Sequence, residues 1–307
     1  MISKTAADGS AGAAPFRCGF VAILGAPNAG KSTLLNRMVG YKVSITSRKP
    51  QTTRERIIGV LTTESAQLIF LDTPGIHHSH SSFNRRIVEG ALSAISDSDV
   101  NLLLLDGVRS DPEAEAMLLA ALAKHPKPTV LALNKIDRID RSTVLSLLCL
   151  WQQRFSFKAM VPISAAKGTQ IDTLQAVLAS ALPACPPLFA PDSITDRSQR
   201  FLAAELIREQ VFRQTGGEIP YAVAVSIESF AGENGPGIVR IDGTIHVERP
   251  SQKGILIGRK GAKLKQIGSA ARSQIEHMLG RQIFLRLFVR VQKNWSKDSN
   301  ALDKFGY

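Results

Sequence analysis

Hydrophobic residues in the first part of the chain gather in short runs that alternate with helix-like segments. Six runs have the length of strands and are almost continuously apolar, and apolar residues recur at helical spacing between the later ones. Parallel strands show such runs because helices cover both faces of their sheet. We therefore predict an α/β domain with a mostly parallel six-stranded sheet. The predicted strands are residues 19–24, 56–62, 67–72, 99–106, 128–134 and 159–164, and the predicted helices are residues 84–96, 111–124, 141–155 and 171–181.

The pattern changes after a proline-rich segment near residue 185, and the rest of the chain predicts a smaller α+β domain. Residues 195–216 form an amphipathic helix in this prediction, with Thr195 or Asp196 as its N-cap. Two strands, two consecutive helical segments and a last strand follow, so the element order is α-β-β-α-α-β. The predicted divisions are a disordered tail (residues 1–16), a first domain (17–183), a linker (184–195) and a second domain (196–307).

Positive charge is concentrated in the second domain. The chain has a formal net charge of +12 and a pI of about 9.9. Residues 249–297 hold twelve Lys or Arg and a single acid, Glu276, which leaves a net charge of about +1 for everything else. A surplus confined to 49 residues indicates a binding surface for an acidic partner such as a nucleic acid.

Cysteine usage and hydropathy exclude other classes of protein. Cys18, Cys149 and Cys185 show no C-x-x-C spacing, so neither a disulfide framework nor a zinc site is predicted, and a reducing cytosol fits. No apolar run approaches the ~18 residues that a membrane-spanning helix needs. We therefore expect a cytoplasmic protein.

A phosphate-binding loop follows the first predicted strand. Residues 25–32 read G-x-x-x-x-G-K-S between a strand and a helix, the context that this motif requires. Its backbone N–H groups and the helix N-terminus favour a polyphosphate. Lys31 is predicted to reach the β- and γ-phosphates, and Ser32 to bind Mg²⁺. The predicted nucleotide contacts here are Gly25, Pro27, Asn28, Ala29, Gly30, Lys31, Ser32 and Thr33.

Three further motifs, each at the carboxyl end of a predicted strand, point to guanine. In the first, Asp72 can hold Mg²⁺ and the Gly75 N–H can meet the γ-phosphate. In the second, Asp137 can accept from guanine N1–H and the 2-amino group, a donor pair that adenine lacks. The third offers backbone N–H groups to guanine O6. The other predicted contacts are Thr73, Pro74, Asn134, Lys135, Ser164, Ala165 and Ala166. The sequence therefore predicts GTP as the nucleotide.

A second glycine-bracketed loop lies in the basic segment. Gly258-Arg259-Lys260-Gly261 has the form of the G-x-x-G loop with which KH domains clamp the backbone of about four single-stranded nucleotides. Arg259 and Lys260 would pair with phosphates, and Lys263 and Lys265 would extend the positive field. The apolar run of Ile255, Leu256 and Ile257 would help form the bed for the bases. The alternative is a solvated basic helix end.

Three further segments accompany these motifs: KPQTTR, TDRSQRF and the terminal GRKGAKLKQIG…NWSKDSNALDKFGY. With them, the chain resembles the Era family of bacterial GTPases from about residue 17 to residue 307. The resemblance implies a Ras-like P-loop GTPase domain followed by a type II KH domain. It also implies binding of 16S ribosomal RNA near its 3′ end during 30S subunit assembly, and peripheral association with the cytoplasmic membrane by a monomer. Ala26, Ala29 and Arg259 stand where Arg, Val and Asn are commoner in the family.

Related GTPases also imply roles in hydrolysis for particular residues. Thr53 is expected to close over the γ-phosphate and Mg²⁺ from a switch segment, with Thr52 as the alternative. Ile76 stands where many GTPases place a water-orienting glutamine, so we expect slow intrinsic hydrolysis. Asn28 occupies a position that helps to hold K⁺ in related GTPases. The expected catalytic residues are Asn28, Lys31, Thr53 and Gly75, and the expected Mg²⁺ ligands are Ser32, Thr53 and Asp72.

Two alternatives belong to other classes of function. A GTPase whose basic domain touches anionic lipid would need Trp or Phe on the apolar face of an amphipathic helix, and the helix that carries residues 258–261 has neither. An RNA-modifying GTPase would need a catalytic constellation in the second domain, and none is evident. The histidines His77, His78 and His80 have no acid or cysteine beside them in the sequence, so a solvated loop is expected there instead of a metal site.

Overall fold

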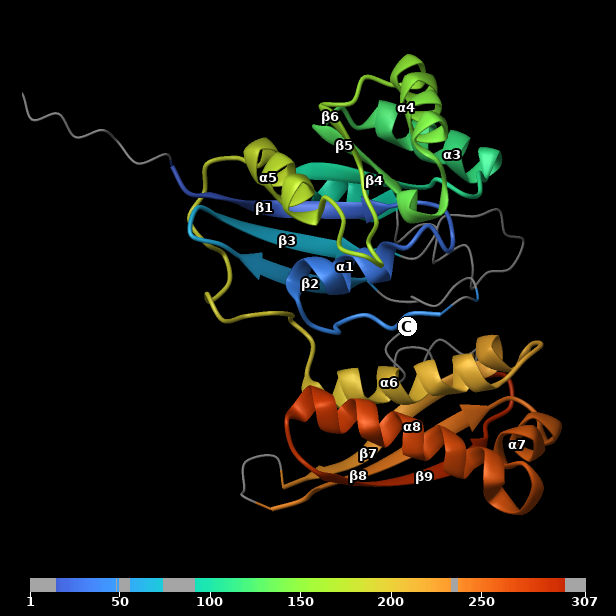
Figure 1. Cartoon of the computed structure of the whole chain (residues 1–307). Helices are drawn as coiled ribbons and strands as arrows, with labels where there is room; N and C mark the ends of the chain where they lie inside the picture. The colour runs from blue at the N-terminus through green and yellow to red at the C-terminus, as the bar shows by residue number, and fades with distance from the viewer. Residues whose placement is uncertain (1–14, 48, 50–55, 74–91, 233–236, 296–307) are drawn as a thin grey trace, which may run out of the picture.

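The computed structural model describes residues 15–47, 49, 56–73, 92–232 and 237–295 of the chain. It contains two domains, one built on a six-stranded sheet and one on a three-stranded sheet (Figure 1). The first domain has a core on each face of its sheet, and the second has a separate core of its own. The predicted fold class, an α/β domain followed by an α+β domain, is confirmed.

The first sheet has the strand order β2-β3-β1-β4-β5-β6, and all neighbouring strands are parallel except the antiparallel pair β2 and β3. Helices α1 and α5 cover one face and α3 and α4 the other, which explains the continuously apolar strands. The strands are β1 (Arg17–Leu24), β2 (Ile57–Thr62), β3 (Ala66–Asp72), β4 (Val100–Asp106), β5 (Thr129–Asn134) and β6 (Ala159–Pro162). The helices are α1 (Lys31–Val39), α3 (Pro112–Lys124), α4 (Arg141–Arg154) and α5 (Ile171–Ala181).

The second sheet has the order β7-β8-β9, with β7 antiparallel and β9 parallel to β8. Helices α6 and α8 pack on one face of it, the face toward the first domain (Figure 1). The G-x-x-G loop divides the helical region at Gly258 into α7 and α8, which gives the predicted order α-β-β-α-α-β. The elements are α6 (Gln199–Gln214), β7 (Val223–Ala231), β8 (Val239–Val247), α7 (Pro250–Ile257), α8 (Ala262–Leu279) and β9 (Ile283–Val291).

The segment that connects the domains is bonded along the first domain. The Gln67 side chain accepts from the backbone N–H groups of Leu188 and Phe189 at 2.8 and 2.9 Å. The Thr195 hydroxyl donates to the Ile58 carbonyl at 2.6 Å and accepts from the Arg197 N–H at 3.3 Å, before α6 begins. The predicted N-cap was wrong: Ser198 caps α6 and accepts from the Phe201 N–H at 3.2 Å.

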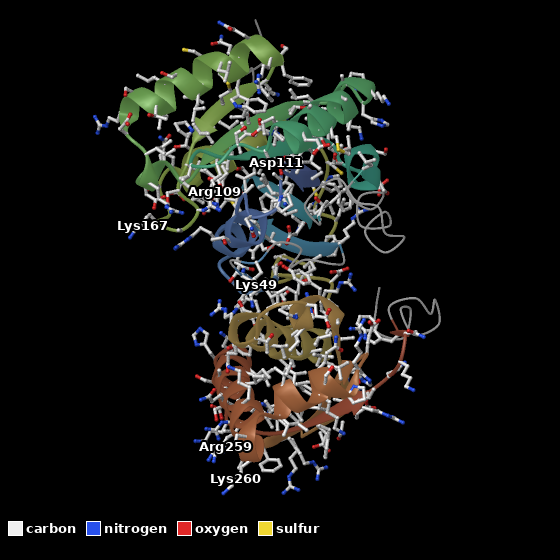
Figure 2. The ribbon with its side chains drawn as sticks, turned by 90° about the vertical axis from the view of Figure 1, so that its right-hand side faces the viewer. Lys49, Arg109, Asp111, Lys167, Arg259 and Lys260 are labelled. Atoms are coloured by element: carbon white, nitrogen blue, oxygen red, sulfur yellow. The ribbon has the colours of Figure 1, made fainter. Side chains whose placement is uncertain are left out.

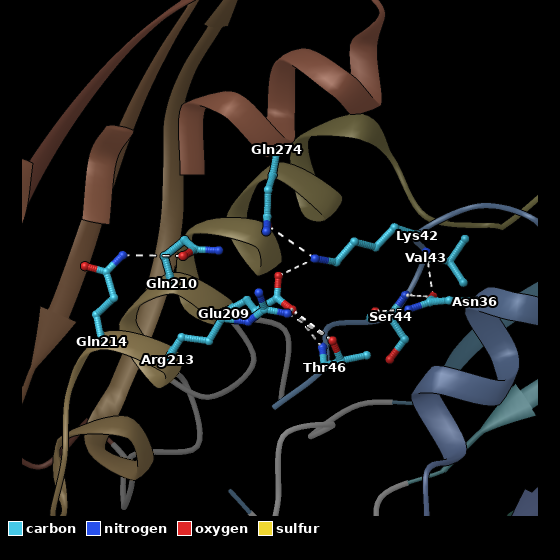
Figure 3. A network of polar contacts seen from close by, with 10 residues as sticks. All are labelled: Asn36, Lys42, Val43, Ser44, Thr46, Glu209, Gln210, Arg213, Gln214 and Gln274. Carbon is cyan, nitrogen blue, oxygen red and sulfur yellow. Dashed lines mark hydrogen bonds and ion pairs between the residues drawn. The ribbon is translucent and has the colours of Figure 1, made fainter. Parts of the chain in front are cut away.

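A network of polar contacts joins the two domains through Glu209 of α6 (Figure 3). The Glu209 carboxylate is buried and forms ion pairs with Lys42 and with Arg213. It also accepts from the Thr46 backbone N–H and hydroxyl, both at 3.1 Å. Lys42 extends the network by donating to Gln274 of α8 at 3.2 Å. The segment from Lys42 to Thr46 of the first domain is therefore held against the second domain.

Replacing Glu209 with glutamine is expected to destabilise this interface. Lys42 lies on one carboxylate oxygen, and Arg213 and Thr46 lie on the other. A glutamine amide keeps one oxygen as an acceptor, but its NH₂ group would face either Lys42 or the pair Arg213 and Thr46, which are donors themselves. We expect the free energy of unfolding to fall by about 1–3 kcal/mol in urea denaturation, as for a buried group left without a partner. Glu64→Gln, at an exposed position of the first domain, should change it by less than ~0.5 kcal/mol; equal effects would contradict the assignment.

Candidate nucleotide site and nucleic-acid interface

The phosphate loop lies between β1 and α1 and has a backbone that only certain residues allow. Gly30 has φ +105°, and a Cβ there would lie 2.4 Å from the Asn134 side-chain nitrogen. Asn28 also has a positive φ, 63°. At Gly25 a Cβ would lie 2.6 Å from the Leu104 carbonyl oxygen. The two glycines are thus required by close approach of neighbouring strand ends, and the loop opens directly onto the N-terminus of α1.

Lys31, the first residue of α1, is buried beneath this loop. Its ammonium donates to the carbonyl oxygens of Gly25 and Ala26, both at 3.0 Å. Burial lowers the pKa of Lys31 from 10.5 to about 8, although the nearby Asp72 carboxylate acts in the opposite direction. The charge that Lys31 offers to a phosphate therefore depends on pH on the alkaline side of neutrality.

This pKa predicts that the affinity for GTP falls at alkaline pH. Below pH 8 the free protein carries the Lys31 proton already, whereas above it the proton must be taken up when the phosphates bind. Because bound phosphates raise the pKa of the lysine, the apparent affinity should decrease by about tenfold between pH 7 and pH 9. A fluorescent GTP analogue titrated at several pH values measures this. Lys31→Arg, which stays charged, should remove the dependence; a flat profile in the wild type would contradict the prediction.

Asp72, at the end of β3, is fully buried and accepts two hydroxyl groups. Ser32 donates to Asp72 Oδ2 at 2.9 Å and Ser44 donates to the same oxygen at 2.8 Å. The Ser32 hydroxyl and the Asp72 carboxylate thus place hard oxygen donors together, which is the donor set that Mg²⁺ prefers. Ser44 was not predicted from the sequence. Only its position in the chain, between α1 and the segment that carries Thr53, could have suggested a place near the nucleotide.

The Asn36 side chain fixes Ser44 beside Asp72. It accepts from the backbone N–H groups of Val43 and Ser44 at 3.0 and 2.9 Å, and it donates to the Ser44 carbonyl at 2.7 Å. Since Thr46 bonds Glu209 two residues further on, a short segment joins the Asp72 site to the second domain (Figure 3). Thr52, Thr53, Pro74, Gly75, Ile76 and the histidines His77, His78 and His80 lie outside the described residues.

The predicted guanine contacts meet at the ends of β5 and β6. Asn134 donates to the Ala29 carbonyl at 2.8 Å and accepts from the Ala165 N–H at 3.0 Å, so it links the phosphate loop to the loop after β6. The Ser164 hydroxyl donates to the exposed Asp137 carboxylate at 2.6 Å. Asp137 is thereby oriented while it remains accessible to a base.

Lys135 and Arg37 support these loops. Lys135 donates to the Asn28 carbonyl at 2.8 Å and forms an ion pair with Asp106 at 2.5 Å. Arg37 of α1 donates to the carbonyls of Ala165 and Ala166. Neither Asp106 nor Arg37 was predicted, because nothing in a local pattern marks them. Of the remaining predicted contacts, Thr73 donates its hydroxyl to the Ile23 carbonyl at 2.8 Å, Pro27 lines a small hollow with Asn28, and Thr33 lies in the first turn of α1.

The G-x-x-G loop projects from the end of the second domain that is far from the first domain, and Arg259 and Lys260 lie at its tip (Figure 2). Both side chains are exposed. Gly258 has φ +69°, and a Cβ there would lie 2.6 Å from the Lys263 Cβ. Gly261 has φ +77°. The loop therefore presents two cations on a turn that needs glycine at both ends.

An open groove runs from this loop between α8 and β9. Its apolar lining comes from Leu264 of α8 and from Leu285 and Leu287 of β9, none of which was predicted. One predicted residue was wrong: Leu256 is fully buried in the core of the domain and cannot touch a base. Ile255 is exposed, and neither it nor Ile257 lines this groove. The groove lining is completed by Gly261, Lys265, Gly268, Ser269, Arg272 and Arg286.

The first domain combines a phosphate-binding loop after β1, the buried Asp72 at the end of β3 and a base-binding loop after β5. These features, on a sheet with helices on both faces, define a P-loop GTPase. The second domain is a KH domain. Family models agree with this class. The model described as 50S ribosome-binding GTPase matches residues 20–135, and the KH domain model matches residues 218–296.

Comparison with relatives identifies the family. The chain is 50% identical over 293 residues to GTPase Era of Geobacter metallireducens and 45% identical over 295 residues to that of Xylella fastidiosa, covering 95% of this chain and 98% of each relative. Two solved structures resemble it with TM-scores of 0.90 and 40% identity over 95% of this chain and 99% of theirs. They are a single-residue variant of Aquifex aeolicus Era bound to GDP.AlF4⁻, and Era in complex with MgGDPNP and nucleotides 1506–1542 of 16S ribosomal RNA. The chain belongs to the Era family of GTPases.

Proposed function

We propose that this GTPase binds 16S ribosomal RNA near its 3′ end and assists the assembly and maturation of the 30S subunit. The observation that carries this proposal is the groove beside the cationic G-x-x-G loop, which belongs to a chain that is 40% identical to an Era protein solved with that part of the RNA. Exposed cations, left-handed glycines and an apolar bed have the chemistry that single-stranded RNA requires.

In the nucleotide site, Ser32 and Asp72, together with Thr53, would hold Mg²⁺. When bound, Mg²⁺ neutralises charge on the β- and γ-phosphates. Lys31 and the N–H groups of the phosphate loop bind the same phosphates, and the Gly75 N–H contacts the γ-phosphate. Oriented by Ser164, Asp137 accepts from the guanine edge. These roles rest on the hydrogen bonds described above and on the positions that the family motifs give to Thr53 and Gly75.

In the second domain, Arg259 and Lys260 would pair with RNA phosphates, and Lys263 and Lys265 would extend the positive field. Bases would lie against Leu264, Leu285 and Leu287, with Ile255 and Ile257 beside the loop. We also propose the domain limits 17–183 and 196–307 with a linker at 184–195. The protein would act as a monomer in the cytoplasm and associate peripherally with the membrane. Within the described residues, no helix combines the length and apolar character needed to cross a bilayer.

Hydrolysis would be slow and would depend on K⁺. The Asn28 backbone has a positive φ, and its carbonyl is held by Lys135, so the side chain stands at a fixed point of the phosphate loop. A monovalent cation there would neutralise charge that develops between the phosphates. We expect GTP hydrolysis to be at least about tenfold faster in KCl than in NaCl of equal ionic strength, as measured by phosphate release. Asn28→Ala should abolish the difference, and equal wild-type rates would overturn the idea.

The test of the proposed function is crosslinking of the intact protein to RNA in cells, followed by sequencing of the crosslinked fragments. We expect crosslinks to concentrate near the 3′ end of 16S ribosomal RNA. A variant with Lys124→Asp and Arg141→Asp, two exposed basic residues of the first domain, is the control and should give the same map. Crosslinks spread over many RNAs, or confined to transfer RNA, would overturn the proposal.

A further inference from the structure

The face of the second sheet that points away from the first domain carries exposed aromatic and basic side chains. Successive residues of a strand point to opposite faces, and β9 directs Phe284, Arg286, Phe288 and Arg290 away from the helices. All four are exposed, Phe284 by 57% and Phe288 by 49%. Arg240 of β8 is exposed beside Phe284. We call these five residues the outer face.

The two rings are exposed side chains of one strand, and exposed apolar groups that gather on one face commonly mark a binding surface. Since a strand rises about 3.3 Å per residue, rings four residues apart stand roughly 13 Å from each other on the same side. Aromatic rings exposed on a sheet offer stacking surfaces to unpaired bases, as in other RNA-binding sheets. The rings alone would also suit other partners, so charge and position decide which partner fits.

The charges of the outer face favour a polyanion. Asp242 holds the Arg286 guanidinium through two hydrogen bonds of 2.9 and 2.7 Å, and the guanidinium carbon lies 5.3 Å from the centre of the Phe288 ring. Arg286 is thereby fixed as part of the stacking surface. Among the described residues, Arg240 and Arg290 form no ion pair with an acid, so both can pair with phosphates.

The outer face is also continuous with the groove described above. β9 is the edge strand of the sheet, and its Leu285, Arg286 and Leu287 line that groove. A chain that leaves the groove across this edge meets Phe284 and Phe288 next. The helices α6 and α8 lie on the face of the sheet toward the first domain, and among the described elements no helix or strand lies over the outer face (Figure 1).

We propose that the outer face is a second RNA-binding surface, on which single-stranded RNA that extends beyond the G-x-x-G groove stacks its bases against Phe284 and Phe288 and pairs its phosphates with Arg240 and Arg290. This inference rests on the proposed RNA-binding function. It adds a stacking platform that reads no particular sequence, since every base has a π-face.

The experiment compares RNAs of two lengths on the full-length protein by fluorescence anisotropy. The short RNA has about four nucleotides from the 3′ region of 16S ribosomal RNA and fits the groove alone. Two long RNAs extend it by about six nucleotides on the 5′ or the 3′ side. We expect the wild type to bind one long RNA more tightly than the short one. Phe284→Ala with Phe288→Ala should lower the affinity for that long RNA by about tenfold or more and leave the short one unchanged.

Control variants separate stacking from other causes. Phe284→Trp with Phe288→Trp should retain the affinity for the long RNA, and Leu145→Ala, at an equally exposed apolar position on α4, should change nothing. A double-alanine variant that binds the long RNA as tightly as the wild type, or that also loses the short RNA, overturns the inference. Wild-type protein that binds no RNA of either length means instead that the proposed function has failed. The last measurement is binding of the wild type and the double-alanine variant to vesicles that contain phosphatidylglycerol. If the double-alanine variant lost vesicle binding but kept RNA binding, the outer face would be a lipid-binding surface and the inference would be wrong.

Discussion

Replacing both Arg259 and Lys260 with aspartate is expected to remove most of the affinity for single-stranded ribosomal RNA. Both side chains are exposed at the tip of the G-x-x-G loop, where two phosphates would lie (Figure 2). Each lost charge-assisted contact is worth about 1.5–3 kcal/mol, so the pair should lower the affinity by about two to four orders of magnitude. The new carboxylates add repulsion at the same two points.

The salt dependence of binding provides an independent readout. Each neutralised phosphate releases counterions, so losing two contacts should reduce the slope of log K against log salt by about 1.4 for a single strand. An anisotropy titration at several salt concentrations measures both quantities. The variant with Lys124→Asp and Arg141→Asp has the same change in net charge and is the matched control; it should keep most of the affinity. Affinity for GTP should not change, because the loop is remote from the nucleotide site (Figure 2). If the loop variant kept its RNA affinity, the loop would not be the RNA clamp.

Asp137→Asn is expected to convert a guanine site into a xanthine site. The carboxylate accepts from the Ser164 hydroxyl and remains exposed to accept N1–H and the 2-amino group of guanine. An asparagine would face that amino group with a donor of its own. Losing two hydrogen bonds to a charged acceptor should lower the GTP affinity by about 3–6 kcal/mol, and xanthosine triphosphate should bind better because its carbonyl at that position accepts from the amide.

Competition titrations measure this change in nucleotide preference. GTP and xanthosine triphosphate compete with a fluorescent GDP analogue on the wild type, and with a fluorescent xanthosine analogue on the variant. Asp140→Asn is the matched control. Asp140 lies three residues further on, at the N-cap of α4, where it accepts from the Thr143 N–H and asparagine serves as well. This control should keep its preference for GTP. A variant at position 137 that bound both nucleotides as the wild type does would place the base elsewhere.

Local sequence determined much of the fold. Helix α5 spans the predicted residues 171–181, and α3 begins after the predicted Asp111, which caps it. Such elements follow from apolar periodicity and capping within one segment, which need no knowledge of the rest of the chain. The start of β7 at Val223 follows from less local causes, because the apolar residues Ile219–Ala222 before it form a 3-10 turn and do not extend the strand.

The chemistry of the two loops could also be predicted, because each motif is contiguous and fixes both its residue types and its backbone. Gly30 and Gly258 have the positive φ that a phosphate-binding turn requires, and both face close neighbours that exclude any side chain. The order of the motifs along the chain placed them at one edge of a parallel sheet, since the carboxyl ends of its strands meet there.

Contacts between residues that are distant in sequence could not be predicted. Glu209 meets Lys42 and Thr46 from more than 160 positions away, and Leu264 meets Leu285 and Leu287 across a groove. Leu256 and Ile255 are neighbours of equal hydrophobicity, yet one is buried in the core and the other is exposed. Composition and periodicity describe each segment by itself, whereas docking of one element on another chooses which side chains face each other. Contiguous motifs therefore predict the two kinds of site, whereas the packing of helices and sheets selects the residues that connect, line and extend them.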